Sequence, residues 1–146
     1  MSNERVITIL NDLLEAEYGN LIHRLGECNP FVAWPAAHDQ AVIRKMLADN
    51  KTHQSDIANL ILVLRGSPVP PTYPTSVGGL HYLDLTYLMP MVISTLKGLV
   101  QAYEAVAGTG LRDADALITR ILADHRTELV ELQRLHANLG VVAAGR

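Results

Sequence analysis

The sequence predicts an all-α protein, a bundle of four helices. In four long segments, apolar residues recur every three or four positions, which is the spacing of one face of an α-helix. Stretches that contain proline or glycine, the residues that most often end helices, separate these segments. Because all four segments follow the helical spacing, we expect no strand.

Length and composition favour one globular domain spanning residues 1–146. The chain has a mass of 16.0 kDa, and 49% of its residues are hydrophobic and 18% charged. A chain of this size can bury a core without a disulfide or a structural metal. Cys28 is the only cysteine, so an internal disulfide and a thiolate metal cluster within one chain are excluded. A net charge of −3 offers no basic surface for nucleic acid.

The same composition predicts a cytoplasmic protein that has no membrane partner. No apolar run approaches the ~20 residues that span a bilayer. The N-terminal residues carry charges where a signal peptide has its apolar stretch.

The first helix is predicted from the capping residues Ser2 and Asn3 to about Glu27. Glu17 lies in the middle of its apolar stripe, where a carboxylate is costly unless it finds a partner. The stripe consists of Ile7, Leu10, Leu14, Glu17, Leu21 and Leu25.

The second helix is predicted from Ala36 to Arg65, with Gly66 ending it. The middle of its stripe is also polar, and Asp49 is either a partner of the His53 imidazole or a solvated residue. The stripe consists of Ile43, Met46, Asn50, His53, Ile57, Leu60 and Leu64.

The segment from Gly66 to Gly79 contains four prolines and is expected to be extended. At ~3.1 Å per residue it covers roughly 40 Å, close to the ~45 Å length of the second helix. Antiparallel neighbours need only a short link, so this length favours a crossover along the bundle and an up-down-down-up order of helices. A surface loop is the alternative interpretation.

The third helix is predicted from about Leu80 to Ala107, with a kink at Pro90, and the centre of its stripe holds no carboxylate. The fourth helix, capped near Asp113, carries a histidine and a glutamate within its apolar stripe. The third stripe consists of Leu85, Leu88, Val92, Thr95, Leu99, Ala102 and Val106, and the fourth of Ile118, Ile121, His125, Glu128, Leu132 and Leu135. The last residues, LGVVAAGR, are expected to fray.

The polar residues within the apolar stripes lie roughly 18–20 Å from their helix ends, at 1.5 Å per residue. We therefore expect Glu17, Asn50, His53, His125 and Glu128 to meet at one level of the bundle. Two carboxylates and two imidazoles can form a structural hydrogen-bond network. The same groups can also bind a divalent transition metal. On the third helix this level is expected at Met91, Val92 and Thr95.

These residues lie in motifs that resemble bacterioferritins. LNDLLEAEYGNLI resembles the opening helix of that family, in which a glutamate at the position of Glu17 binds a di-iron centre. His53 is followed by an apolar stretch, Gly66 and Pro68, as after the metal-binding histidine of the second ferritin helix. ILADHRTELVEL resembles the fourth helix, in which ILAD precedes a Glu-x-x-His pair. The resemblance implies a ferritin-like four-helix bundle with metal in its core.

The departures from the family pattern change the expected metal content. Asn50 takes the place of a glutamate, and His125 and Glu128 reverse the Glu-x-x-His order. Two carboxylates balance one divalent ion rather than two. We therefore predict one ion bound by Glu17, His53, His125 and Glu128, with Asn50 as a weak or indirect partner.

Iron is the first candidate for this ion, with zinc or manganese as alternatives. The implied chemistry is redox or oxygen-linked, with no catalytic residue assigned and enzymatic activity left open. The alternative is a non-enzymatic bundle whose polar layer fixes helix register and which acts through association with protein. Long amphipathic helices favour a homo-oligomer, a dimer. The tail after Gly140 is too short for the extra helix of ferritin cages.

Overall fold

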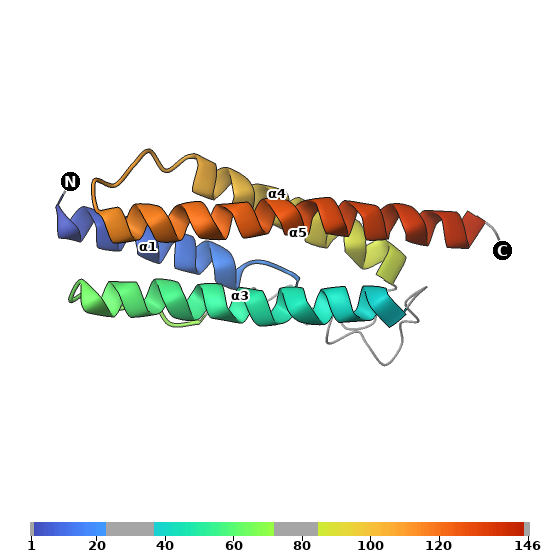
Figure 1. Cartoon of the computed structure of the whole chain (residues 1–146), viewed down its shortest axis with the longest axis horizontal. Helices are drawn as coiled ribbons and strands as arrows, with labels where there is room; N and C mark the ends of the chain where they lie inside the picture. The colour runs from blue at the N-terminus through green and yellow to red at the C-terminus, as the bar shows by residue number, and fades with distance from the viewer. Residues whose placement is uncertain (1, 23–36, 72–84, 145–146) are drawn as a thin grey trace.

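The computed structural model describes residues 2–22, 37–71 and 85–144. They form the helices α1 (Asn3–Tyr18), α3 (Ala37–Val63), α4 (Leu85–Glu104) and α5 (Arg112–Ala144), which lie side by side as a bundle (Figure 1). These three ranges contain no strand, so the predicted all-α class is confirmed. No helix in them is long and apolar enough to cross a membrane.

Helices α1 and α3 are antiparallel. Gly66, just after α3, packs against Ile7 near the start of α1. At the other end Asn20, just after α1, donates a hydrogen bond to Asn50 in the middle of α3, with 3.2 Å between Nδ2 and Oδ1. Low residue numbers of one helix therefore meet high numbers of the other.

Helix α4 is antiparallel to α1 as well. Tyr103 contacts Glu17, whereas Thr95 accepts a hydrogen bond from the backbone N–H of Leu21. Because α3 and α4 both oppose α1, they run in the same direction, and α5 runs in the same direction as α1 (Figure 1). The helix directions are those of the predicted up-down-down-up order.

The chain that follows α3 lies along α1. The side chain of Asn11 donates to the carbonyl of Ser67 at 3.1 Å and accepts from the N–H of Val69 at 2.8 Å. The hydroxyl of Tyr18 then donates to the carbonyl of Val69 at 3.3 Å. Residues 72–84 lie outside the described residues, so the complete crossover stays a prediction.

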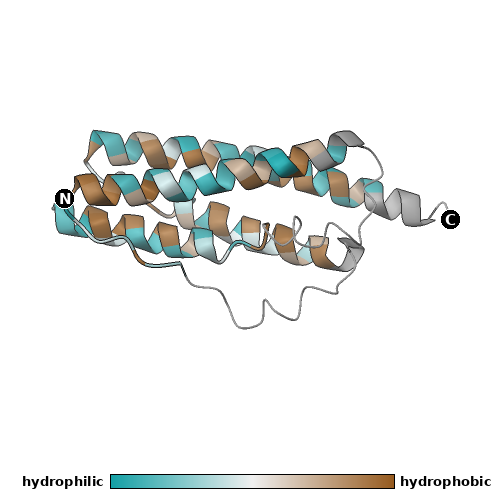
Figure 2. Ribbon diagram, turned by 90° about the horizontal axis from the view of Figure 1, so that it is seen from below, coloured by the Kyte–Doolittle hydropathy of each residue, from teal (hydrophilic) through white to brown (hydrophobic). Residues whose placement is uncertain are grey.

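All four helices contribute to one core. Apolar and polar bands alternate along each helix, as in amphipathic helices (Figure 2). The largest of the fully buried side chains are Tyr103, Leu10, Leu14, Ile22, Ile57, Ile61, Leu88, Met89, Leu96, Ile121 and Leu132.

Several helix ends differ from the sequence-based expectation. Helix α1 ends at Tyr18 rather than near Glu27, because Gly19 ends the helix and the Asn20 side chain accepts a hydrogen bond from the N–H of Ile22. Helix α4 ends at Glu104 rather than at Ala107; it contains Pro90 as expected, and the kink there stays a prediction. Helix α5 continues to residue 144, so most of the predicted frayed tail is helical. Cys28 lies outside the described residues.

The end of α3 depends on two adjacent residues. Arg65 has a φ of 66°, the left-handed conformation that glycine usually takes at a helix end. The N–H of Gly66 closes the last turn by donating to the carbonyl of Ile61 at 2.9 Å. Only glycine at position 66 allows the chain to pack this closely against the side chains of Ile7 and Ile61. A Cβ there would lie 2.7 Å from Cγ2 of Ile7 and 3.0 Å from Cγ2 of Ile61.

Candidate metal centre

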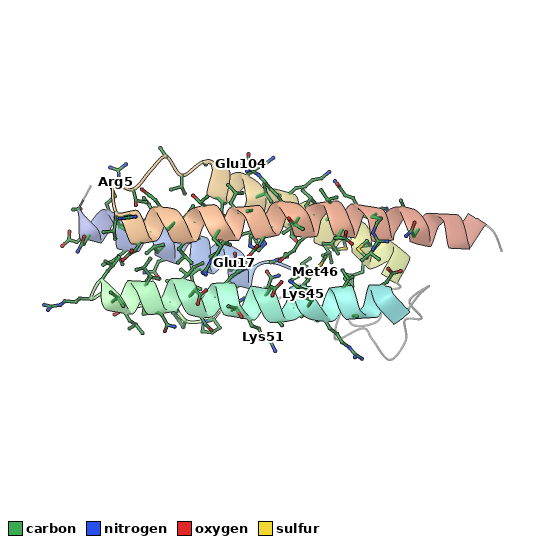
Figure 3. The ribbon with its side chains drawn as sticks, in the orientation of Figure 1. Arg5, Glu17, Lys45, Met46, Lys51 and Glu104 are labelled. Carbon is green, nitrogen blue, oxygen red and sulfur yellow. The ribbon has the colours of Figure 1, made fainter. Side chains whose placement is uncertain are left out.

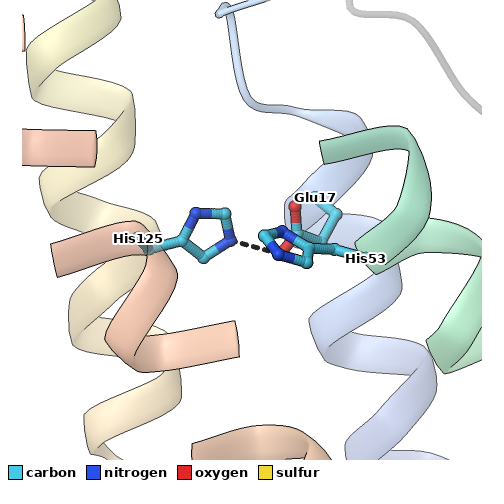
Figure 4. Close-up of side chains that lie close together, drawn as sticks. All are labelled: Glu17, His53 and His125. Atoms are coloured by element: carbon cyan, nitrogen blue, oxygen red, sulfur yellow. Dashed lines mark hydrogen bonds and ion pairs between the residues drawn. The ribbon is translucent and has the colours of Figure 1, made fainter. Parts of the chain in front are cut away.

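Three buried side chains from three helices meet inside the bundle. Glu17 of α1, His53 of α3 and His125 of α5 are 1%, 3% and 0% exposed. Each offers a ligand atom, and these atoms all lie within 4.8 Å of one another. Figure 4 shows the imidazole of His125 pointing toward the carboxylate of Glu17, and the ring centroids of His53 and His125 lie 5.0 Å apart in an edge-to-face arrangement. In Figure 3, Glu17 lies between the helices, whereas Lys51 of α3 points away from the bundle.

Both ring nitrogens of His125 contact carboxylates. Nε2 lies 2.6 Å from Oε1 of Glu17, and Nδ1 lies 3.2 Å from Oε2 of Glu128, one turn further along α5. Burial lowers the pKa of His125, but the hydrogen bonds to Glu128 and Glu17 and the charges of both carboxylates outweigh it and raise the pKa to about 9. At neutral pH and without an ion, His125 is therefore an imidazolium between two carboxylates.

His53 is held by one nitrogen only. Its Nε2 lies 3.0 Å from Oδ2 of Asp124, and a carboxylate oxygen can only accept, so Nε2 carries the proton. The other nitrogen, Nδ1, is buried and has no hydrogen-bond partner among the described residues. Asp49, the partner considered from the sequence, instead pairs with Lys45 at 2.7 Å.

Glu17 also has one atom in use and one without a partner. Its Oε1 accepts hydrogen bonds from the ring of His125 and from the hydroxyl of Tyr103, both at 2.6 Å. Its Oε2 is buried and unpaired among the described residues. A buried polar atom without a partner costs ~1–3 kcal/mol, and coordination of a cation is one way to satisfy such an atom. The residues therefore fit a metal ion.

The remaining predicted polar residues lie in the same layer. Glu128 is 5% exposed and Asn50 is 6% exposed. Asn50 Nδ2 donates to Oε2 of Glu128 at 3.2 Å and to the carbonyl of Met46 at 2.8 Å. Glu128 is not one of the three grouped ligands, because it contacts the opposite nitrogen of His125.

Sequence reasoning missed three residues of this layer: Tyr103, Asp124 and Asn20. The expected level on the third helix was wrong, because Met91 is 37% exposed and Thr95 lies beside Leu21 rather than beside Glu17. The signal for Tyr103 was present, since it ends a buried series spaced by three and four. That series is Leu88, Val92, Leu96, Leu99 and Tyr103.

Comparison with known proteins identifies the fold. No family model and no curated protein matches the chain. Among solved structures, the chain is similar to the bacterioferritin-related protein from Bacteroides fragilis, described as a dodecameric thioferritin. The two share 19% sequence identity and a TM-score of 0.73, over 99% of this chain and 92% of that one. This chain has a ferritin-like fold.

The metal-binding residues of ferritin-like di-iron proteins follow a common pattern. Two helices each supply a glutamate, and two others each supply a Glu-x-x-His pair. In this ferritin-like bundle α1 supplies Glu17, whereas α4 supplies Tyr103 in place of a carboxylate. Helix α3 supplies Asn50 and His53, and α5 supplies a reversed pair, His125 and Glu128. Two of the residues at this level, Glu17 and Glu128, are buried carboxylates.

Proposed function

We propose that this ferritin-like chain binds one divalent transition metal ion through Glu17, His53 and His125. The observation that carries the proposal is the pair of buried, unpaired ligand atoms, Oε2 of Glu17 and Nδ1 of His53. Their residues belong, with His125, to a group in which one ligand atom from each residue lies within 4.8 Å of the others. A carboxylate oxygen and imidazole nitrogens suit iron, zinc and manganese, with iron as the first candidate.

The charges of the layer support one ion rather than two. Glu17 and Glu128 carry two negative charges, and without metal the His125 imidazolium offsets one of them. A ligand imidazole must be neutral, so a divalent ion would replace that proton and balance both carboxylates. Glu128, predicted as a ligand, enters the proposal as the residue that holds the other nitrogen of His125.

Bound iron would supply redox chemistry in a site closed to bulk water. The protein's contribution would be the orientation of its ligands: Asp124 fixes the ring of His53, and Glu128 fixes the ring of His125. Asn50 would hold Glu128 through its amide.

The second candidate function is a structural role for the polar layer. It is favoured by the fact that both ring nitrogens of His125 already contact carboxylates. The Glu17, His125 and Glu128 side chains form a buried triad, and such networks can fix helix register without a metal. The bundle would then act through association with protein.

Metal analysis of protein purified without an affinity tag tests both candidates. We expect about one transition metal ion per chain, lost in Glu17→Gln and retained in Glu15→Gln, a change to an exposed carboxylate on the same helix. Chelator should lower the melting temperature of the native protein at pH 8. An unchanged melting temperature with chelator, together with no gain on adding divalent ions, would leave only the structural network.

We further propose that the chain is a homo-oligomer and that the segment from Gly66 to Gly79 crosses over along the bundle. The similarity to a dodecameric protein supports homo-oligomerisation, and the sequence favours a dimer. Helix α3 ends at one end of the bundle and α4 begins at the other (Figure 1), so the chain between them must travel the length of the bundle, which supports the crossover. Sedimentation equilibrium distinguishes two subunits from twelve, and a monomeric mass would exclude both.

A further inference from the structure

Tyr103 is the residue of α4 that reaches the candidate metal centre. It lies in the last turn of α4 and is 1% exposed. Its hydroxyl lies 2.6 Å from Oε1 of Glu17, and its ring centroid lies 5.6 Å from that of His125. Within the described part of α4, no other side chain forms a hydrogen bond to Glu17, His53 or His125.

The contact sets which oxygen of Glu17 remains unpaired. Oε1 accepts from both Tyr103 and His125, so it has two donors, whereas Oε2 has none among the described residues. The tyrosine hydroxyl has its proton to donate, because burial and the charge of Glu17 hold the pKa of Tyr103 well above its ordinary value. If a metal ion took the place of the proton on Nε2 of His125 and that proton left to solvent, Tyr103 would be the one donor left on Oε1 among the described residues.

We propose that Tyr103 is a positioning residue for Glu17: by donating to Oε1 it leaves Oε2 as the atom that binds metal. This inference rests on the proposed function. It assigns α4 a neutral donor rather than a charged ligand, which is consistent with a centre of two carboxylates and one ion. Groups that orient metal ligands typically contribute 10–100-fold to metal affinity.

The chain offers a matched control one residue from Glu17. Tyr18 is half-buried, and its hydroxyl donates to the backbone carbonyl of Val69 at 3.3 Å. Tyr103→Phe and Tyr18→Phe each remove one hydroxyl and keep the ring. Only the first removes a hydrogen bond to the Glu17 carboxylate.

The experiment titrates the full-length wild type and both variants with zinc ions, by competition with a chromophoric chelator, and measures the melting temperature of each metal-free protein. We expect Tyr103→Phe to weaken zinc binding about 10–100-fold and Tyr18→Phe to leave it unchanged. A merely structural role would lower the melting temperature of Tyr103→Phe without changing zinc affinity, and that result would overturn the inference alone.

Two further outcomes separate this inference from the proposed function. Absence of zinc, iron and manganese binding by the wild type would overturn both. Ultraviolet difference spectra of the wild type, which need no variant to fold, should show no tyrosinate on zinc binding. A tyrosinate signal would make Tyr103 a phenolate ligand and overturn its assignment as a neutral donor, leaving the metal site intact.

Discussion

Asp124 of α5 holds the imidazole of His53 of α3, with 3.0 Å between Oδ2 and Nε2. The carboxylate is 49% exposed and the imidazole 4% exposed, so a surface residue fixes the orientation of a buried one. The contact directs the unpaired Nδ1 of His53 away from Asp124, on the opposite edge of the ring.

Removing this carboxylate should weaken metal binding. We expect Asp124→Ala to lower zinc affinity about 10–100-fold. The free energy of unfolding should also fall by about 1–3 kcal/mol, because the buried Nε2–H of His53 loses its partner. Asp56→Ala is the control, since Asp56 pairs with Arg120 between the same helices and does not contact the site. Equal zinc affinities in the two variants would contradict this role of Asp124.

The stability of the metal-free protein should fall as the pH rises from about 6.5 to 9. The folded-state pKa of His125, about 9, is raised above its ordinary value. Its stabilisation is therefore fully present below about pH 6.5 and is lost as the pH passes through about 9. Urea unfolding across this range should show the loss, and His125→Gln should remove it. Metal affinity should change in the opposite direction, rising with pH as the proton leaves.

Gly66 and Gly98 should respond oppositely to alanine. A Cβ at Gly66 would lie 2.7 Å from Cγ2 of Ile7, so Gly66→Ala should destabilise the protein by about 1–3 kcal/mol. Gly98 lies within α4 with nothing within 4 Å of a Cβ, so Gly98→Ala should stabilise it by ~0.5–1 kcal/mol. Chemical denaturation measures both, and a stabilising Gly66→Ala would contradict the close contact of α1 with the end of α3.

Arg65→Gly should stabilise the protein. Arg65 adopts a φ of 66°, which costs a residue with a side chain about 1–2 kcal/mol and glycine very little. The greater freedom of glycine in the unfolded chain offsets part of this gain, so we expect an increase of about 1 kcal/mol in the free energy of unfolding. A decrease would show that the Arg65 side chain contributes more than its backbone strain costs.

The sequence was sufficient for the helices and for most of the polar layer because both depend on local spacing. Glu17, Asn50, His53, His125 and Glu128 stand on apolar stripes, and all five are buried in one layer. A polar residue on such a stripe must enter the core with its helix, whatever the neighbouring helices are.

The missing partners depend on register between helices, which one sequence does not specify. Asp124 stands beside the stripe of α5 and reaches His53 only because of the way α3 and α5 are aligned. Tyr103 was missed because α4 is staggered against α1, so that the last turn of α4 rather than its middle lies level with Glu17. Asn20 was assigned to a helix that has already ended at Tyr18.

The centre unites residues of unequal local stability. Glu17 and Tyr103 each lie one residue before the end of their helices, whereas His53 and His125 lie many residues from either end of theirs. Helix ends open far more often than helix interiors, and the backbone amides there exchange hydrogen with solvent sooner. An ion held by α1, α3 and α5, with Tyr103 of α4 hydrogen-bonded to one of its ligands, would slow exchange at the ends of α1 and α4 and leave the middles of α3 and α5 nearly unchanged. The occupancy of the centre would thus be recorded in the backbone at two helix ends, independently of any spectroscopic property of the metal.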